Sequence, residues 1–380
     1  LKTNLKPYII RGEYFVPEGK ELHIEEGAIF IAEKDSQISV SGILLINGSK
    51  NKPVIFRGKA DSASFWKGLQ IKQNKKPSII KFAQVSNALI GMHFHMTESG
   101  HPEIDGCILN NNDIGMKIDC AGEISISNCL FSDNLQDGIW IHASMPKIKN
   151  CTIFRNRGWG INNKRNSRAK VSRTIITKNN KGGIYMEANY DLDVEAHECI
   201  LEGNQNYDVC NEDSRDFDFS KNWWGNETTR SLLTGGDTLN VQKVYDGLDK
   251  DGIGRVRIHD FLKEIPKNAG TFASEKEMLP IEEKKSISPQ LAKGTAVQFK
   301  NTAYLIGDTS AFNPFFKSVA DGNSSEIQKY LKTGSVIEIE KGTSAVIVTS
   351  SGPAYGVKLL EGKNKGKQGW VLKNDVETIK

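Results

Sequence analysis

Histidine, aspartate and lysine side chains recur at matching places in a repeated part of this chain, and such residues can move protons. Several glycines are each followed by a run in which apolar and polar residues alternate. In three successive runs the second polar position holds His95, Asp119 and His142, and Lys117 occupies the first polar position beside Asp119. Imidazole gains and loses a proton near neutral pH. As hypothetical catalytic residues, His95 and His142 could exchange protons with a substrate, with Asp119 fixing their tautomers and Lys117 pairing with a substrate carboxylate.

Aromatic and polar side chains fill other positions of the same runs. The residues predicted to contact a ligand there are His93, Trp140, Asn162, Lys164, Tyr185 and Glu187. Flat aromatic faces suit sugar rings, and polar neighbours can hydrogen-bond to hydroxyl groups. The pattern favours binding of a polysaccharide. The catalytic alternative is β-elimination or epimerisation next to a uronate carboxylate, and a solvated surface without any ligand is the simplest alternative.

Other kinds of site agree less well with these runs. A glycosidase needs two carboxyl groups about 5–9.5 Å apart, whereas Asp119 and Glu187 would lie about 14 Å apart if the runs are stacked strands. A calcium site would need several converging carboxylates. His95, Asp119 and His142 form a set that can also hold a transition metal, but we predict neither a metal nor another cofactor.

The runs belong to a unit of about 23 residues that is repeated along the chain. The glycines that begin the runs are Gly68, Gly91, Gly115, Gly138, Gly160 and Gly183. Alternation with a period of two is typical of strands, and a unit this short cannot bury an apolar face unless neighbouring units stack. A leucine-rich repeat has a similar length, but the chain lacks its leucine frame. The sequence therefore predicts a parallel β-solenoid.

Stacking in register would bring residues of successive units together. Strands of neighbouring units lie about 4.8 Å apart, and alternation turns the polar residues of each run outward. His95, Asp119 and His142 would then form one outward row with Asp119 in the middle.

Asparagines recur four residues before most of these glycines. Stacked asparagine side chains satisfy backbone groups of turns and bond to one another along the stack. We predict a structural ladder made of Asn87, Asn111, Asn134, Asn156, Asn179 and Asn204.

The cysteines follow the same repeat. Cys107, Cys129 and Cys151 are 22 residues apart, and the sequence contains no C-x-x-C pair. We expect these three to stack inside the core as small apolar side chains. Cysteine usage therefore does not decide the redox compartment.

Composition changes along the chain indicate five segments. We assign residues 1–65 to an N-terminal cap and the first coils, and residues 66–225 to regular coils. Residues 226–263 are predicted to form a C-terminal cap, and the charged stretch 264–290 a linker. Short strands separated by glycine turns, with one helix, predict a small β-barrel in residues 291–380.

The regular coils resemble the right-handed parallel β-helix repeat family, whose members include pectate-lyase-like proteins. The resemblance rests on the run Pro146-x-Ile148-x-Asn150-Cys151-x-Ile153-x-x-Asn156, on its copies, and on the Asn222-Trp223-Trp224-Gly225 ending. It covers roughly residues 8–263 and implies the fold. It is less informative about function, since such folds include lyases, hydrolases, epimerases and binding proteins.

The last segment is similar to bacterial SH3-like domains, through its glycine turns and Gly369-Trp370-Val371. That similarity implies binding or tethering, often at the cell envelope. A third alternative function follows, in which the solenoid is a structural spacer that presents this domain.

Net charge, the length of apolar runs and the first residue limit which partners and which cellular location we expect. The net charge of +4 is too small and scattered to favour nucleic acid, and no apolar run is long enough to span a bilayer. The chain starts at Leu1 rather than Met, so we expect that a secretory segment has been removed. We predict a secreted, periplasmic or cell-surface monomer that binds polysaccharide or cell-wall glycan.

Overall fold

The computed structural model places most of the chain. The residues that it describes are 7–72, 76–95, 100–236, 239–271, 294–300, 302–307, 315, 324–351, 354–372 and 375–378. They form two compact units, Leu1–Met278 and Leu279–Lys380. No helix within these described ranges is long and apolar enough to cross a membrane.

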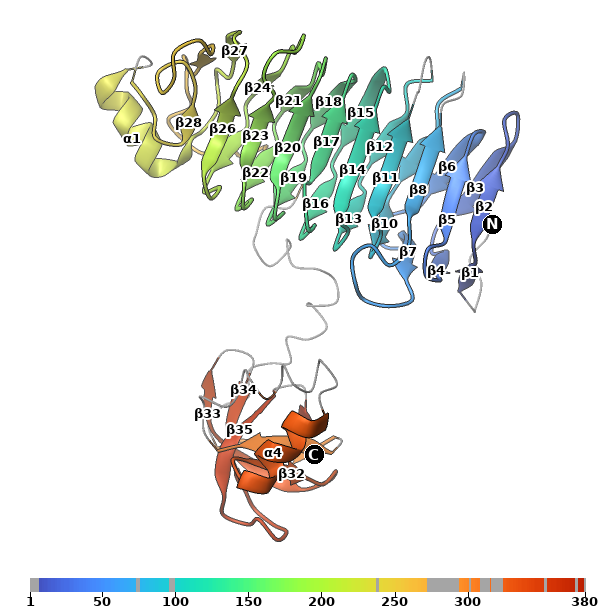
Figure 1. The fold of residues 1–380 in the computed structure, drawn as a ribbon, viewed down its shortest axis with the longest axis vertical. Coiled ribbons are helices and arrows are strands. Elements are labelled where there is room, and N and C mark those ends of the chain that lie inside the picture. The colour runs from blue at the N-terminus through green and yellow to red at the C-terminus, as the bar shows by residue number, and fades with distance from the viewer. Residues whose placement is uncertain are drawn as a thin grey trace. The chain divides into compact units, whose positions relative to one another are not determined.

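Three parallel sheets, which we call A, B and C, form the solenoid of the first unit (Figure 1). Sheet A contains β1 (Tyr8–Ile10), β4 (Ile29–Ala32), β7 (Val54–Gly58), β10 (Ala83–Ser86), β13 (Ile108–Asn110), β16 (Leu130–Ser132), β19 (Thr152–Phe154), β22 (Ile175–Thr177) and β25 (Ile200–Glu202). Sheet B contains β2 (Glu13–Val16), β5 (Gln37–Val40), β8 (Gly68–Lys72), β11 (Ile90–His95), β14 (Ile114–Asp119), β17 (Ile139–His142), β20 (Trp159–Lys164), β23 (Gly182–Met186), β26 (Tyr207–Asn211) and β28 (Val244–Tyr245). Sheet C contains β3 (Glu21–Glu25), β6 (Ile43–Asn47), β9 (Ile79–Lys81), β12 (Glu103–Asp105), β15 (Glu123–Ser127), β18 (Met145–Lys149), β21 (Lys170–Ser172) and β24 (Glu195–His197).

Each regular coil contributes one strand to each sheet, and the strands of successive coils lie side by side along the solenoid (Figure 1). The pairings within these sheets are parallel and in register, as between β14 and β17. The predicted parallel β-solenoid is therefore confirmed. A leucine-rich repeat is excluded here because its repeats combine one strand with a helix or a 3₁₀ segment, whereas these coils place strands in three sheets.

Inward-facing side chains of sheet B stack from coil to coil. Ile139 pairs with Ile161 on the next strand, and Ile161 pairs with Ile184 on the strand after that. All three are completely buried. Burying one such side chain contributes about 1.5–3 kcal/mol. Asn163 also points inward and is completely buried, and its amide donates to the backbone oxygen of Tyr185 at 3.1 Å. That hydrogen bond offsets part of the cost of a polar group in the core.

A ladder of asparagines runs along the coils beside this core. Its consecutive members Asn134, Asn156, Asn179 and Asn204 are at most 1% exposed. Each of the first three donates a hydrogen bond from its side-chain amide to the ladder asparagine of the next coil. The Asn134 amide, for example, donates to Asn156 Oδ1 at 2.8 Å. These four residues occupy the places that the sequence predicted.

The prediction was wrong for the other two asparagines. Asn112, rather than Asn111, is the buried ladder member, and its Oδ1 accepts from the backbone nitrogen of Ala88 at 2.9 Å. Asn111 and Asn87 have left-handed φ angles of 55° and 63°, and the Asn87 amide donates to Asp61. Both are turn residues, a role that asparagine fills because it tolerates this conformation.

The recurring glycines are explained by close approach between coils. A Cβ atom at Gly138 would lie 2.8 Å from the carbonyl oxygen of Gly160 and 2.9 Å from Asn156 Nδ2. At Gly115 it would lie 2.8 Å from Asn134 Nδ2. Only glycine leaves room there for the neighbouring backbone and for the ladder amides.

The predicted cysteine stack is confirmed. Cys107, Cys129 and Cys151 are completely buried and carry free thiols. The backbone nitrogen of Cys107 donates to Cys129 Sγ at 3.4 Å. Burial raises the pKa of the Cys129 thiol, so Cys129 is a packing group rather than a thiolate.

The C-terminal end of the solenoid contains the helix α1 (Gly225–Gly235) and a small sheet of β27 (Phe217–Asp218) and β29 (Val256–Arg257). Leu232 of α1 is buried in the same hydrophobic core as the coils. The end of the stacked core is thus covered, which a solenoid requires.

Residues 262–271 lie along the outer surface of sheet A, and we call them the strap. The backbone nitrogen of Gly270 donates to the oxygen of Arg173 at 2.8 Å, and Ala269 packs in a buried cluster with Trp223. The first part of the predicted linker is therefore bound to the solenoid. The remainder of that predicted linker lies outside the described residues.

The second unit contains a seven-stranded antiparallel sheet and the helix α4 (Ser324–Thr333). In spatial order the strands are β32 (Val336–Ile339), β31 (Ala303–Ile306), β35 (Gln368–Leu372), β34 (Ala354–Leu359), β33 (Ser344–Ser351), β30 (Ala296–Phe299) and β36 (Val376–Thr378). The all-β character agrees with the expectation, while the likeness to SH3-like domains remains a prediction.

Candidate functional site

Strands β11, β14 and β17 bring the candidate proton-transfer residues into one outward row. Asp119 is paired in register with His95 on one side and with His142 on the other. In the adjacent row His93 is paired with Lys117. The structure thus brings together side chains that are 23 or 24 residues apart in sequence, while their chemical roles remain predictions.

A hydrogen-bonded pair lies at the centre of the row. His142 Nδ1 is 2.7 Å from Asp119 Oδ1. Burial acts to raise the pKa of the Asp119 carboxyl, but the hydrogen bond with His142 and the charge of Lys117 outweigh it and lower the pKa. Because an ionised carboxylate can only accept, Nδ1 of His142 must be the donor. In neutral His142 this leaves Nε2 as the basic nitrogen.

Lys117 connects this pair to the aromatic part of the surface. Its ammonium nitrogen is 3.6 Å from Asp119 Oδ2 and 4.5 Å from the ring centroid of Trp140. The Lys117 side chain is 25% exposed, so the cation remains accessible. A cation over an indole face contributes about 0.5–1 kcal/mol at such a surface.

His93 and His95 lie on one strand, β11, and both are next to the Asp119 carboxylate of the neighbouring strand β14. Their ring centroids are 5.6 Å apart, and His95 Nδ1 is 3.7 Å from Asp119 Oδ2. Burial, followed by the charges of Lys117 and His95, lowers the pKa of His93 to about 4. His93 is therefore a neutral imidazole at neutral pH.

Tyr185 is less available to a ligand than the sequence suggested. Its ring stacks on Trp159 with centroids 5.0 Å apart, and the Lys164 ammonium lies 4.9 Å from its centroid. Its hydroxyl also donates to the Glu212 carboxylate. The sequence analysis missed Trp159, although an aromatic residue directly before Gly160 was a signal for it.

Asn162 occupies the predicted row but is only 8% exposed. Its amide donates to Asp137 Oδ2 at 2.7 Å, and the backbone nitrogen of Trp159 donates to Asp137 Oδ1 at 2.7 Å. Burial raises the pKa of Asp137. The expectation of an exposed Asn162 was therefore wrong, because the predicted alternation could not reveal the buried Asp137 beside it.

An ion pair between Lys164 and Glu187 lies at the end of the row beyond His142. Lys164 Nζ is 2.9 Å from Glu187 Oε1, and both side chains are about one-quarter exposed, at 26% and 28%. Partly exposed pairs of this kind contribute about 0–1 kcal/mol, so a ligand can compete for either partner at small cost.

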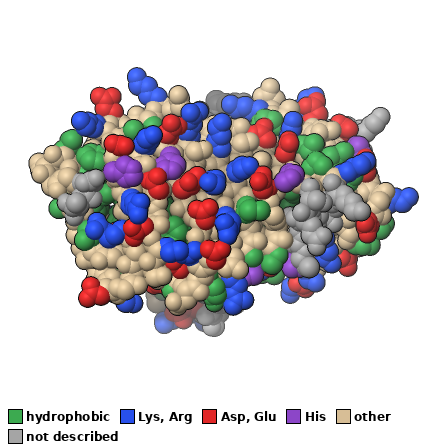
Figure 2. All heavy atoms as spheres, turned by 90° about the horizontal axis from the view of Figure 1, so that it is seen from above, with side chains coloured by type: hydrophobic (Ala, Val, Ile, Leu, Met, Phe, Trp, Pro, Cys, Tyr) green, Lys and Arg blue, Asp and Glu red, His purple; other side chains and the backbone are tan. Residues whose placement is uncertain are grey.

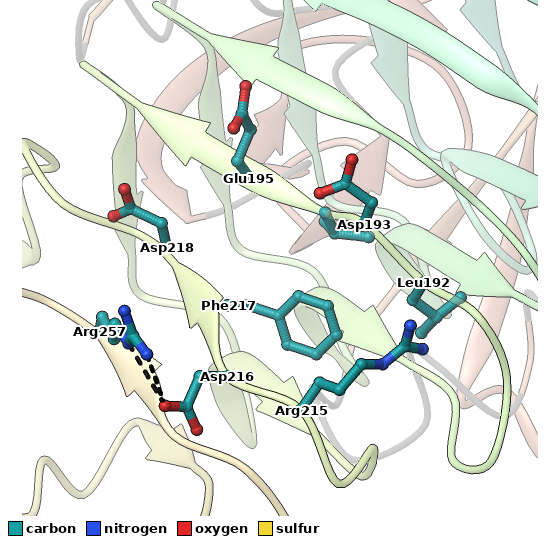
Figure 3. A pocket seen from close by; sticks show the side chains of 9 residues that line it. Leu192, Asp193, Glu195, Arg215, Asp216, Phe217, Asp218 and Arg257 are labelled. Atoms are coloured by element: carbon teal, nitrogen blue, oxygen red, sulfur yellow. Dashed lines mark hydrogen bonds and ion pairs between the residues drawn. The ribbon is translucent and has the colours of Figure 1, made fainter.

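A cavity of about 390 Å³ lies elsewhere, at the C-terminal end of sheet C (Figure 3). Figure 3 shows the carboxylates of Asp193, Glu195 and Asp218 around it. Arg257 is paired there with Asp216 at 2.9 Å. None of the residues lining this cavity comes from the rows on sheet B, so the two regions are separate.

Charges of both signs are interspersed over the face of the molecule seen in Figure 2. Pairs between neighbouring coils of sheet C follow the same pattern, as between Lys147 and Glu123 at 2.9 Å. An evenly mixed surface creates little long-range attraction.

A comparison with protein-family models agrees with the architecture of the coils. Residues 92–243 match the family model described as a right-handed β-helix region. None of the curated proteins compared with this chain is a significant match. A solved structure of a mutant of the periplasmic alginate epimerase AlgG is 13% identical, with a TM-score of 0.30, covering 68% of this chain and 79% of that chain. The first unit is thus a right-handed parallel β-helix.

Proposed function

We propose that the outward face of sheet B, from β11 to β23, binds an anionic polysaccharide and that the protein works outside the cytoplasm. The observation that carries this proposal is the contact of Lys117 with both Trp140 and Asp119. One cation next to one partly exposed indole can take the carboxylate and the ring of a uronate unit together.

Neighbouring groups support the same reading. His142 and Asp119 add polar atoms on one side of Trp140, whose ring lies 5.7 Å from that of His142. On the other side, Lys164 and Glu187 form the partly exposed pair. A linear polymer could run along the stacked strands and contact several coils, whereas the covered Tyr185 and Asn162 have only supporting roles.

Catalysis is the second candidate, and the bond between His142 and Asp119 favours it. The carboxylate holds Nδ1–H, so Nε2 of neutral His142 could remove the proton next to a uronate carboxylate. Lys117 would stabilise the negative charge that then develops on that carboxylate. Return of a proton on the opposite face would give epimerisation, and loss of the leaving oxygen would give elimination.

Binding can be tested by calorimetry with polygalacturonate, using dextran as the uncharged control. We expect binding of polygalacturonate only, and Trp140→Ala should weaken it about tenfold, or about 1.4 kcal/mol. Tyr14→Ala is a matched control, because Tyr14 is an aromatic residue on sheet B that is 50% exposed. Equal loss in both variants, or none in Trp140→Ala, would contradict the proposed surface.

The catalytic alternative needs its own readouts. Elimination produces an unsaturated sugar that absorbs ultraviolet light, and epimerisation in D₂O incorporates deuterium. Either signal should disappear in His142→Gln while polygalacturonate binding persists. Binding without any product supports a binding protein, and absence of both supports the spacer alternative.

A further inference from the structure

Two histidine nitrogens on β11 are buried without hydrogen bonds. Among the described residues, neither His93 Nε2 nor His95 Nδ1 has a hydrogen-bond partner, although both atoms are shielded from solvent. A buried polar atom without a partner costs about 1–3 kcal/mol. Two such atoms on side chains of one strand face indicate that something else satisfies them.

Asp119 of the next coil completes a set of three ligand atoms. One atom each from His93, His95 and Asp119 lies within 4.8 Å of the other two. His95 Nδ1 and Asp119 Oδ2 are 3.7 Å apart. Ligands at about 2.0–2.1 Å around a tetrahedral ion are separated by about 3.3 Å, so small side-chain rotations suffice to close the set.

We propose that His93 Nε2, His95 Nδ1 and Asp119 Oδ2 bind a divalent transition-metal ion of the zinc class. Two imidazoles and one carboxylate suit such ions, whereas calcium and magnesium prefer oxygen ligands alone. The three ligands leave at least one coordination position open to solvent or to another ligand.

The surroundings of Asp119 fit this assignment. His142 Nδ1 holds the second carboxylate oxygen, Oδ1, at 2.7 Å, which leaves Oδ2 directed toward the two imidazoles. Ligating carboxylates are commonly oriented by such an outer hydrogen bond, whose loss costs about 10–100-fold in metal affinity. His142 is thus a positioning residue for the metal.

A second group of potential ligands shares Asp119 but is less suitable. It consists of Asp119, Cys120 and His142. Two of its ligand atoms, His142 Nδ1 and Asp119 Oδ1, already bond to each other. Cys120 Sγ is 3.6 Å from Asp119 Oδ1 and 3.8 Å from His142 Nδ1. The ligand atoms of this second group therefore already have hydrogen-bond partners, whereas His93 Nε2 and His95 Nδ1 have none among the described residues.

Lys117 would compete with the metal for the Asp119 carboxylate. Its Nζ is 3.6 Å from the same Oδ2, so a bound cation would displace the ammonium group from the carboxylate. Released from Asp119, Lys117 could pair with a ligand over Trp140. This last consequence rests on the proposed function, whereas metal binding itself does not.

The test uses the full chain, stripped with a chelator, in calorimetric titrations with Zn²⁺ and without glycan. One ion per chain should bind, and His93→Gln and His95→Gln, which each remove a ligand, should lower the affinity at least about as much as loss of an outer hydrogen bond does, about 100-fold or more. His142→Gln should lower it about 10–100-fold, and Lys117→Met should raise it. His23→Gln is the matched control, because His23 bonds to Glu21 on sheet C; its affinity should equal that of the unmodified chain.

Co²⁺ spectra distinguish the two ligand sets. The proposed set gives visible d–d bands and no thiolate charge-transfer band, and Cys120→Ser leaves them unchanged. Loss of binding in Cys120→Ser with retention in His93→Gln, or no binding of Zn²⁺ at all, would overturn the proposal. Calorimetry with polygalacturonate in the presence of chelator is scored separately, so failure of either proposal is recognisable on its own.

Discussion

Asn112 and Asn111 are adjacent residues of the same type with different structural duties. The Asn112 amide donates to the oxygen of Val85 at 3.0 Å, and its Oδ1 accepts from the nitrogen of Ala88. Asn112→Ala would leave both backbone groups without partners, at about 1–3 kcal/mol each. We therefore expect a loss of at least about 2 kcal/mol in the free energy of unfolding, measured with urea.

Asn111→Gly is the control for that prediction. Glycine adopts the left-handed φ of 55° without strain, and the ladder does not use the Asn111 side chain. Its free energy of unfolding should stay within about 0.5 kcal/mol of the unmodified chain. A larger effect at Asn111 than at Asn112 would show that the ladder has been assigned to the wrong residue.

Asp208 ends the ladder and links its stability to pH. Its Oδ1 accepts from the amide of Asn204 at 2.8 Å and from the Asn204 backbone nitrogen at 3.1 Å. Burial raises the pKa of Asp208 despite these hydrogen bonds. A carboxyl with a raised folded pKa contributes stability that is complete below its unfolded pKa, about 3.9. That contribution is lost as the pH rises through the folded pKa.

Asp208→Asn should remove this dependence, since an amide oxygen can accept the same two hydrogen bonds. We expect the variant to gain relative to the unmodified chain as the pH rises above about 4, by at most about 1.4 kcal/mol per pH unit. Urea unfolding at pH 4, 5, 6 and 7 measures the difference. A difference independent of pH would contradict the assignment.

The attachment of the strap to sheet A depends on one glycine. Gly270 has a φ of +79°, and a Cβ there would lie 2.4 Å from Ile175 Cδ1. Gly270→Ala combines backbone strain of about 1–2 kcal/mol with a steric clash. We expect the strap to detach from sheet A, with faster hydrogen exchange and proteolysis in residues 262–271.

Gly252→Ala separates the two effects. Gly252 has a φ of +87°, and no atom lies within 4 Å of the position that a Cβ would take, so alanine there carries the backbone strain alone. The strap should stay protected in that variant. Equal exposure of the strap in both variants would mean that packing against Ile175 is unimportant.

In the first unit, the coil stack makes a surface site out of residues that no short segment contains. Lys117 and Trp140 meet because β14 and β17 are adjacent in sheet B. Both proposals depend on that register, since a shift by one residue would turn the row into the core. The second unit folds around its own core, and the binding or tethering role expected for it from the sequence remains a prediction.

Much of this arrangement was accessible from the sequence. Glycine spacing and a period of two are local properties, so they predicted the coils, the inward face and the row through His95, Asp119 and His142. The strands of sheet B confirm that register. Short strand-like runs separated by glycine turns also indicated that the second unit is mainly β-structure.

Tertiary structure decided the contacts that depend on other coils. It placed Asn112 rather than Asn111 in the ladder, buried Asn162 against Asp137, and stacked Trp159 on Tyr185. A repeat pattern gives each residue a direction but not its partner. Partners are set by side chains more than 20 residues away in sequence, whose positions exist only once the coils have closed on one another.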